Sequence, residues 1–205
     1  MTRAAALALA GAVLGAACGS SAYTYVSSPA AGAYFRIPRA WHLFDEAEIR
    51  RHNGEGPASE DDEFRYLAIF DADPEPSLDH DLETAAQPFG LVRVRELAGT
   101  ERDGYSLASL RNEMIPVDRI AGQDNAQVRD LAPPVSVEMG RTLAGTRLVY
   151  AVEHDGLSYA VHQVGLLDRG TRVVYFFLVG CRLDCFEANR ATIDAVARSW
   201  TVEEP

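Results

Sequence analysis

The chain contains three cysteines, and the position of the first one indicates its chemistry most directly. Cys18 follows an apolar run, Ala4 to Ala17, which contains only Ala, Leu, Gly and Val and is preceded by Arg3. A short basic segment, an apolar run below about 20 residues and a small-residue exit are typical of an export signal. A buried core helix would show a polar face, which this run lacks. We therefore predict that residues 1–17 are a signal peptide and that the protein acts outside the cytoplasm.

The residues just before Cys18 indicate how the signal is removed. The segment Leu14-Gly15-Ala16-Ala17-Cys18 resembles a bacterial lipobox, in which small residues precede the cysteine that becomes lipidated. The resemblance implies a multiply acylated Cys18, carrying palmitate or similar chains, and two or more acyl chains anchor a protein stably to a membrane. The alternative is cleavage after Ala22 by ordinary signal peptidase, which would give a secreted protein.

The rest of the chain divides simply. Residues 18–32 are rich in Ser, Ala and Gly, which predicts a lipidated cysteine followed by a tether. Residues 33–205 have the length and apolar content of a single globular domain.

The other two cysteines, Cys181 and Cys185, form an even pair once Cys18 is assigned to lipid. Their spacing is not that of a redox C-x-x-C motif, and a second Cys/His pair that would complete a zinc site does not stand nearby in the sequence. Two reduced thiols are the alternative, but disulfides persist outside the cytoplasm. We expect a local disulfide.

Acidic residues suggest a metal site only at first sight. Asp71, Asp73, Glu75 and Asp79 begin like a calcium-binding loop, but Pro76 and Leu82 stand where that loop needs Gly and a bidentate Glu. The histidines are not spaced as paired ligands on one helical face; they are His42, His52, His80, His154 and His162. We expect a solvated acidic loop, no metal site and no cofactor.

Catalytic motifs are absent from the sequence. It contains no G-x-S-x-G nucleophile elbow, no P-loop and no dinucleotide-binding G-x-G-x-x-G. All 19 basic residues are Arg, which excludes Schiff-base chemistry, and the net charge of −11 argues against nucleic-acid binding. We therefore predict no catalytic residue. The alternative is a secreted hydrolase in which His42, His154 or His162 meets a Ser or a carboxylate only in three dimensions.

The elements that would form the domain are read from periodicity and turn signals. Val173 to Val179 is apolar at every position, so both faces of this strand must be covered. Asp155-Gly156 predicts a two-residue hairpin turn that places Val152 opposite Tyr159 and Tyr150 opposite Val161. The expected strands are 33–37, 64–70, 89–97, 145–153, 158–167 and 171–180, the expected helices are 45–51, 106–114 and 186–199, and 116–134 is expected to be loop.

These elements predict an α+β fold: an antiparallel sheet with a C-terminal three-strand meander, covered by helices on both faces. The predicted domain begins with an aromatic strand, Pro and Trp (Tyr34 to Trp41), and closes with an apolar strand and a helix that ends in Ser199-Trp200. This order is similar to that of the PsbP/Mog1-like α/β/α sandwich proteins, which include many bacterial lipoproteins. The resemblance implies a non-catalytic binding or scaffold domain at the cell envelope, held by its lipid anchor, whose partner is an envelope protein or a small ligand.

Overall fold

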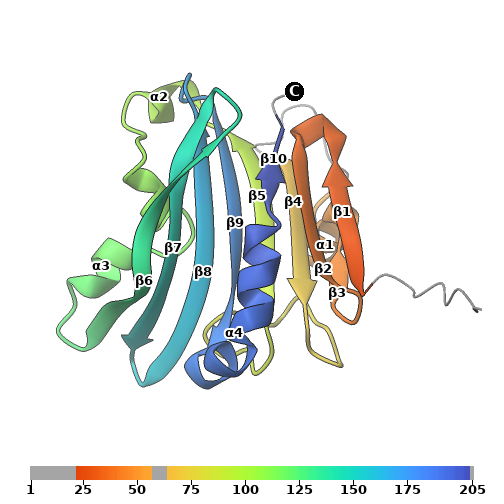
Figure 1. Ribbon diagram of the computed structural model, residues 1–205, viewed down its shortest axis with the longest axis vertical. Helices are drawn as coiled ribbons and strands as arrows, with labels where there is room; N and C mark the ends of the chain where they lie inside the picture. Colours follow the sequence, from red (N-terminus) through yellow and green to blue (C-terminus); the bar gives the residue numbers. More distant parts are fainter. Residues whose placement is uncertain (1–21, 57–63, 204–205) are drawn as a thin grey trace, which may run out of the picture.

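The computed structural model describes residues 22–56 and 64–203. Strands form two antiparallel sheets, a three-stranded sheet with the order β1-β2-β10 and a seven-stranded sheet with the order β3-β4-β5-β9-β8-β7-β6 (Figure 1). The strands are β1 (Tyr23–Ser28), β2 (Ala33–Pro38), β3 (His42–Phe44), β4 (Phe64–Asp71), β5 (Phe89–Glu96), β6 (Ala126–Met139), β7 (Leu143–His154), β8 (Leu157–Asp168), β9 (Val173–Arg182) and β10 (Thr201–Val202). The helices are α1 (Glu46–His52), α2 (Gly99–Arg102), α3 (Val117–Ala121) and α4 (Leu183–Arg198), with 3₁₀ turns η1 (Pro29–Ala31) and η2 (Ser109–Asn112).

The predicted C-terminal meander is confirmed as β7-β8-β9. Asp155 and Gly156 both adopt positive φ, at 52° and 80°, as a two-residue hairpin turn requires. Tyr150 pairs with Val161 and Val152 with Tyr159, which is the register that the turn predicts.

Strand β9 is buried on both faces, as its uninterrupted apolar sequence predicts. Val173, Tyr175 and Phe177 belong to one buried cluster, and Val174, Phe176 and Leu178 belong to another. The seven-stranded sheet therefore needs a separate cover on each side.

The first face is covered by α4 and by the three-stranded sheet (Figure 1). Phe177 on β9 lies with its ring centroid 5.7 Å from Phe35 on β2 and 5.6 Å from Trp200, which follows α4. Trp200 is 1% exposed, so this aromatic contact joins the two sheets and the end of α4 in one core.

The second face is covered by residues 97–121, where the expected helix over 106–114 is wrong. The segment contains only short helical pieces, and Leu107 and Met114 are exposed while Leu110 is fully buried. Polar contacts hold this conformation: the Gln163 side-chain amide donates to the Leu110 carbonyl at 2.7 Å. The buried carboxylate of Glu113 accepts from Arg95 at 2.8 Å and from Arg93 at 2.6 Å. These partners come from the sheet, so helical periodicity cannot reveal them.

Two further expectations are corrected. Residues 23–28 of the expected tether form β1, because Tyr23 to Ser28 pair with Pro38 to Ala33 along the whole strand. Residues 116–134, expected to be loop, contain α3 and most of β6. The strand was not predicted because Pro133 and Pro134 are consecutive prolines, which disfavour a strand; they lie where the register of β6 with β7 shifts. Prolines are tolerated there because β6 is an edge strand.

Cys181 at the end of β9 and Cys185 in the first turn of α4 are joined by a disulfide. Both residues are buried, so the bond ties the last strand of the meander to the helix that covers it. Within the described ranges, no helix is both long enough and apolar enough to cross a membrane.

Candidate functional site

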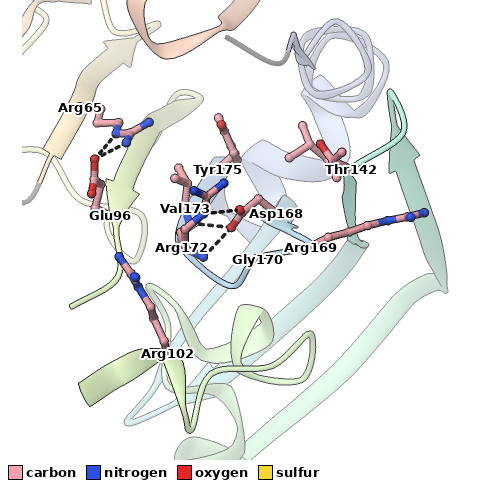
Figure 2. Close-up of a pocket in the computed structure, with 11 residues that line it drawn as sticks. Arg65, Glu96, Arg102, Thr142, Asp168, Arg169, Gly170, Arg172, Val173 and Tyr175 are labelled. Atoms are coloured by element: carbon pink, nitrogen blue, oxygen red, sulfur yellow. Dashed lines mark hydrogen bonds and ion pairs between the residues drawn. The ribbon is translucent and has the colours of Figure 1, made fainter. Parts of the chain in front are cut away.

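A pocket of about 750 Å³ lies at one end of the seven-stranded sheet (Figure 2). It is built where strands begin or end: Arg65 at the start of β4, Glu96 at the end of β5, and the turn between β8 and β9. Its lining consists of Arg65, Glu96, Arg102, Thr142, Leu143, Asp168, Arg169, Gly170, Arg172, Val173 and Tyr175.

Asp168 shapes the turn that carries two of the pocket's arginines. Its Oδ1 accepts hydrogen bonds from the backbone N–H groups of Arg172 at 2.5 Å and Val173 at 2.8 Å. Burial opposes ionisation of Asp168, but these N–H groups and the Arg172 guanidinium outweigh burial and lower the pKa of Asp168 below its usual value. The turn is therefore held in one conformation by an ionised carboxylate at neutral pH.

The arginines give the pocket an excess of positive charge. Four arginines line it against two carboxylates, in a chain whose net charge is −11. Arg65 pairs with Glu96, and the Nε of Arg102 donates to the Leu97 carbonyl at 3.1 Å. Arg172, with 66% of its side chain exposed, pairs with Asp168 at 3.3 Å.

The arginines do not converge on one point. Arg169 extends away from the Arg172–Asp168 pair, and Arg65 and Arg102 lie on the other side of it (Figure 2). The positive charges are spread around the rim, while Leu143, Val173 and Tyr175 beneath them are almost completely buried. Such an arrangement can bind several separated anionic groups, because each guanidinium pairs well with a carboxylate.

The histidines expected of a hydrolase are scattered. His162 on β8 is 2% exposed, and its Nδ1 lies 2.9 Å from Asp194 on α4, but its Nε2 is buried without a hydrogen-bond partner among the residues that the structure describes. His154 pairs with its neighbour Asp155 at 3.3 Å. His42 is exposed and contacts the ring of Phe44. The His162–Asp194 pair has the geometry of a base and its orienting carboxylate, but His162 does not line the pocket at the end of the sheet.

The acidic loop after β4 is organised by one buried carboxylate. Asp71 is 1% exposed and accepts from the backbone N–H groups of Asp73 at 2.8 Å and Ser77 at 3.0 Å. His80 lies 2.7 Å from the same carboxylate, and this hydrogen bond raises the pKa of His80 above its usual value. Within the described ranges, no group of three or more His, Cys, Asp or Glu side chains is placed to hold a metal ion. Asp71, the first residue of the calcium-like pattern, therefore uses its carboxylate to hold the loop together through hydrogen bonds.

The sequence did not predict this pocket, which we call the arginine pocket after Arg65, Arg102, Arg169 and Arg172. Its residues come from four separated segments, and only the fold brings them together. The one signal in the sequence is the use of Arg at every basic position, which does not single out these four. Cys18, the predicted lipidation site, lies outside the described residues.

Comparison with known proteins identifies the fold. Neither a family model nor a curated protein sequence matches the chain. Among solved structures, cyanobacterial PsbP (CyanoP) of Synechocystis sp. PCC 6803 is 16% identical with a TM-score of 0.53, covering 96% of this chain and 99% of that one. LpqN of Mycobacterium tuberculosis, described as involved in cell envelope biogenesis, is 14% identical with a TM-score of 0.50, covering 89% and 91%. The Ran-binding protein Mog1p of Saccharomyces cerevisiae is 12% identical with a TM-score of 0.45, covering 89% and 96%.

The matches to CyanoP and LpqN extend over nearly the whole of each compared chain. They show that this protein has the PsbP/Mog1-like fold, a mixed α+β architecture built on antiparallel sheets, at low sequence identity. The resemblance inferred from the order of strands, Pro, Trp and the final helix is confirmed at the level of the fold.

Proposed function

We propose that this protein is an envelope lipoprotein, anchored outside the cytoplasm through acylated Cys18, whose domain binds an acidic segment of a partner protein without catalysis. The observation that carries the binding function is the arginine pocket, a local excess of positive charge on an acidic chain. The anchoring rests on the signal peptide over residues 1–17 and the lipobox-like segment that ends at Cys18.

The spread of the arginines favours a polypeptide over a small anion. A site for one phosphate needs several donors aimed at the same point. Here Arg169 points away from Arg172, and Glu96 and Asp168 lie between the positive charges (Figure 2). An extended segment that carries several carboxylates can pair with separated guanidiniums, and the pocket's volume of about 750 Å³ accommodates a few of its side chains.

The pocket stays accessible when the chain is anchored. Ala22 is fixed beside Arg39, because the Ala22 carbonyl accepts a hydrogen bond from the Arg39 N–H at 3.0 Å. Strand β3, which follows Arg39 in the chain, pairs with the end of β4. The pocket residue Arg65 lies at the start of β4. The eight residues of β4 place its two ends about 23 Å apart, so the pocket at the start of β4 is well separated from the end of β4 that lies near Ala22.

Two features support the envelope location. The Cys181–Cys185 disulfide suits an oxidising compartment outside the cytoplasm. LpqN, which shares the fold, is described as taking part in cell envelope biogenesis. We also propose that η2 and α3 form the second helical layer of an α/β/α sandwich, because Leu110 and Val117 pack on the face opposite α4.

Anchoring is tested by metabolic labelling with a fatty-acid analogue and fractionation of the cells. The wild-type chain should take up the label and fractionate with membranes, whereas Cys18→Ala should lose the label and leave a precursor or a secreted form. An unlabelled wild-type chain would show that the anchor is wrong and leave cleavage after Ala22 as the mode of export.

A further inference from the structure

The outward face of the three-stranded sheet is aromatic and basic. Paired residues of antiparallel strands project to the same face, and Tyr25 pairs with Arg36 while Ser27 pairs with Tyr34. The neighbouring residues on these strands, such as Phe35 and Ile37, are buried against the core. We call Tyr25, Ser27, Tyr34 and Arg36 the tyrosine face.

A groove of about 620 Å³ joins the tyrosine face to the end of α4. All four residues of the face line it, and Ala195, Arg198 and Ser199 of the helix end form the opposite wall. The groove's lining includes two arginines and no carboxylate, although the chain as a whole is acidic. Asp194, which precedes Ala195, and Glu203, two residues after Thr201, do not line the groove.

Both arginines have guanidinium donors to offer. Arg36 is half-buried and its guanidinium lies 4.4 Å from the ring centroid of Tyr23; its Nε is buried, so contact with a ligand falls to the terminal nitrogens. Arg198 is exposed and forms no ion pair within the described part of the chain. Tyr25 is 70% exposed, which is the largest exposure among the large apolar and aromatic side chains described.

The position of the anchor determines what this face meets. The chain is fixed on the domain from Ala22, so four peptide steps lead from Cys18 to the edge of the small sheet. Four residues extend over at most about 14 Å. Strand β1, at the outer edge of the molecule in Figure 1, is therefore held beside the bilayer surface when Cys18 is acylated.

We propose that the tyrosine face and its groove bind the phosphate of lipid headgroups in the anchoring membrane. Tyrosine prefers the headgroup level of a bilayer, where its ring contacts apolar groups and its hydroxyl stays hydrated. Arg36 and Arg198 donate to the phosphate oxygens, a pairing that guanidinium geometry suits. A zwitterionic headgroup presents the same phosphate without net charge, so the acidity of the whole chain does not prevent this contact. The orientation of the domain rests on the proposed anchoring at Cys18, but the phosphate site does not.

The first test uses the lipidated protein reconstituted in phosphatidylcholine vesicles that contain a brominated lipid as quencher. Tyr25→Trp places a fluorescent reporter on the tyrosine face, and Leu107→Trp, an exposed position on the opposite side of the seven-stranded sheet, is the matched control. The native Trp41 and Trp200 contribute the same background to both. We expect quenching of the reporter at position 25 and not at position 107. Equal quenching at the two positions, or none at position 25, would overturn the orientation.

The second test measures the phosphate site apart from the anchor. The secreted Cys18→Ala form is titrated with glycerophosphoglycerol, a soluble headgroup, and with inorganic phosphate. We expect the headgroup to bind more tightly and Arg198→Gln to weaken it by about tenfold. Arg198 is exposed, so this variant should fold normally, and Arg129→Gln is the control at an exposed arginine elsewhere.

The two tests separate the two proposals. If fatty-acid label is absent from wild-type Cys18 but the headgroup still binds through Arg198, the anchoring fails and the phosphate site stands. If inorganic phosphate binds as well as the headgroup, or if Arg198→Gln binds like the wild type, the lipid-headgroup site is wrong whatever the result at Cys18.

Discussion

The imidazole of His162 on β8 is buried against the carboxylate of Asp194 on α4, with Nδ1 and Oδ1 2.9 Å apart. Burial is the main influence on this histidine and lowers its pKa, as do the positive charges of Arg147 and Arg198; the hydrogen bond and charge of Asp194 act in the opposite direction but do not prevail. His162 is therefore neutral in the folded protein at pH values where an exposed histidine takes up a proton.

This relationship predicts a pH dependence of stability. A histidine with a lowered folded-state pKa binds protons more readily in the unfolded chain, so it lowers the free energy of unfolding as the pH falls below about 6.5. We expect His162→Gln to flatten the decrease in stability between pH 7 and 5, measured by urea unfolding at each pH. His154→Gln, at a less buried site, is the control. A wild-type slope that is unchanged in His162→Gln would contradict this account of the buried pair.

The disulfide predicts a difference in melting temperature. Its ring is small, since Cys181 and Cys185 are four residues apart, so it stabilises the domain by only about 2 kcal/mol. We expect the Cys181→Ser/Cys185→Ser double variant to fold and to melt about 4–8 °C lower, as measured by calorimetry. Intact-mass analysis after alkylation without reductant should find both thiols of the wild type protected. Two alkylated cysteines in the denatured wild type would refute the bond.

The centre of β9 predicts a large effect of truncation. Phe177 is fully buried between rings of Phe35, Phe70 and Trp200, so Phe177→Ala should cost about 3–5 kcal/mol of unfolding free energy. Val135→Ala, at a half-exposed position on the edge strand β6, should change it by less than about 0.5 kcal/mol. Amide exchange across 173–179 should be among the slowest in the chain; rapid exchange there would show that the strand is misplaced.

A close approach of two strands predicts an effect at a glycine. A Cβ at Gly145 on β7 would lie 1.9 Å from the backbone oxygen of Gly165 on β8, and backbone cannot move aside as a flexible side chain can. Gly145→Ala should therefore destabilise the domain by about 1–3 kcal/mol in denaturant unfolding. At Gly99 a Cβ would meet no atom within 4 Å, so Gly99→Ala is the control. Equal stability of the two variants would show that the strands are not so close.

Most strands of the sheet could be predicted because alternation of residue types and turn residues mark them in the local sequence. The faces of β9 and the register of the β7–β8 hairpin follow from alternation and from Asp155-Gly156. The second covering layer could not be predicted, because Leu110 and Glu113 are placed by contacts to residues far along the chain. The strand β1 was missed because Ser and Ala suggested a tether.

The candidate site was beyond prediction for a similar physical reason. The pairing of β4, β5 and β9 brings Arg65, Arg102 and Arg172 together so that they line one pocket. An arginine that will bind a partner and one that will be solvated have the same local sequence signal. The arginine pocket is therefore a property of the fold.

The measurement that tests the proposed binding function most directly is a titration of the protein with an acidic peptide probe, hexaglutamate, followed by calorimetry at low and at physiological salt. The wild type should bind it, with an affinity that falls as salt rises, and Arg169→Glu/Arg172→Glu should abolish binding because both changes reverse charge on the pocket rim. Arg119→Glu/Arg129→Glu makes the same change in net charge at exposed arginines outside the pocket and should bind like the wild type. If the two double variants lose affinity equally, or if the wild type does not bind, the arginine pocket is not the binding site.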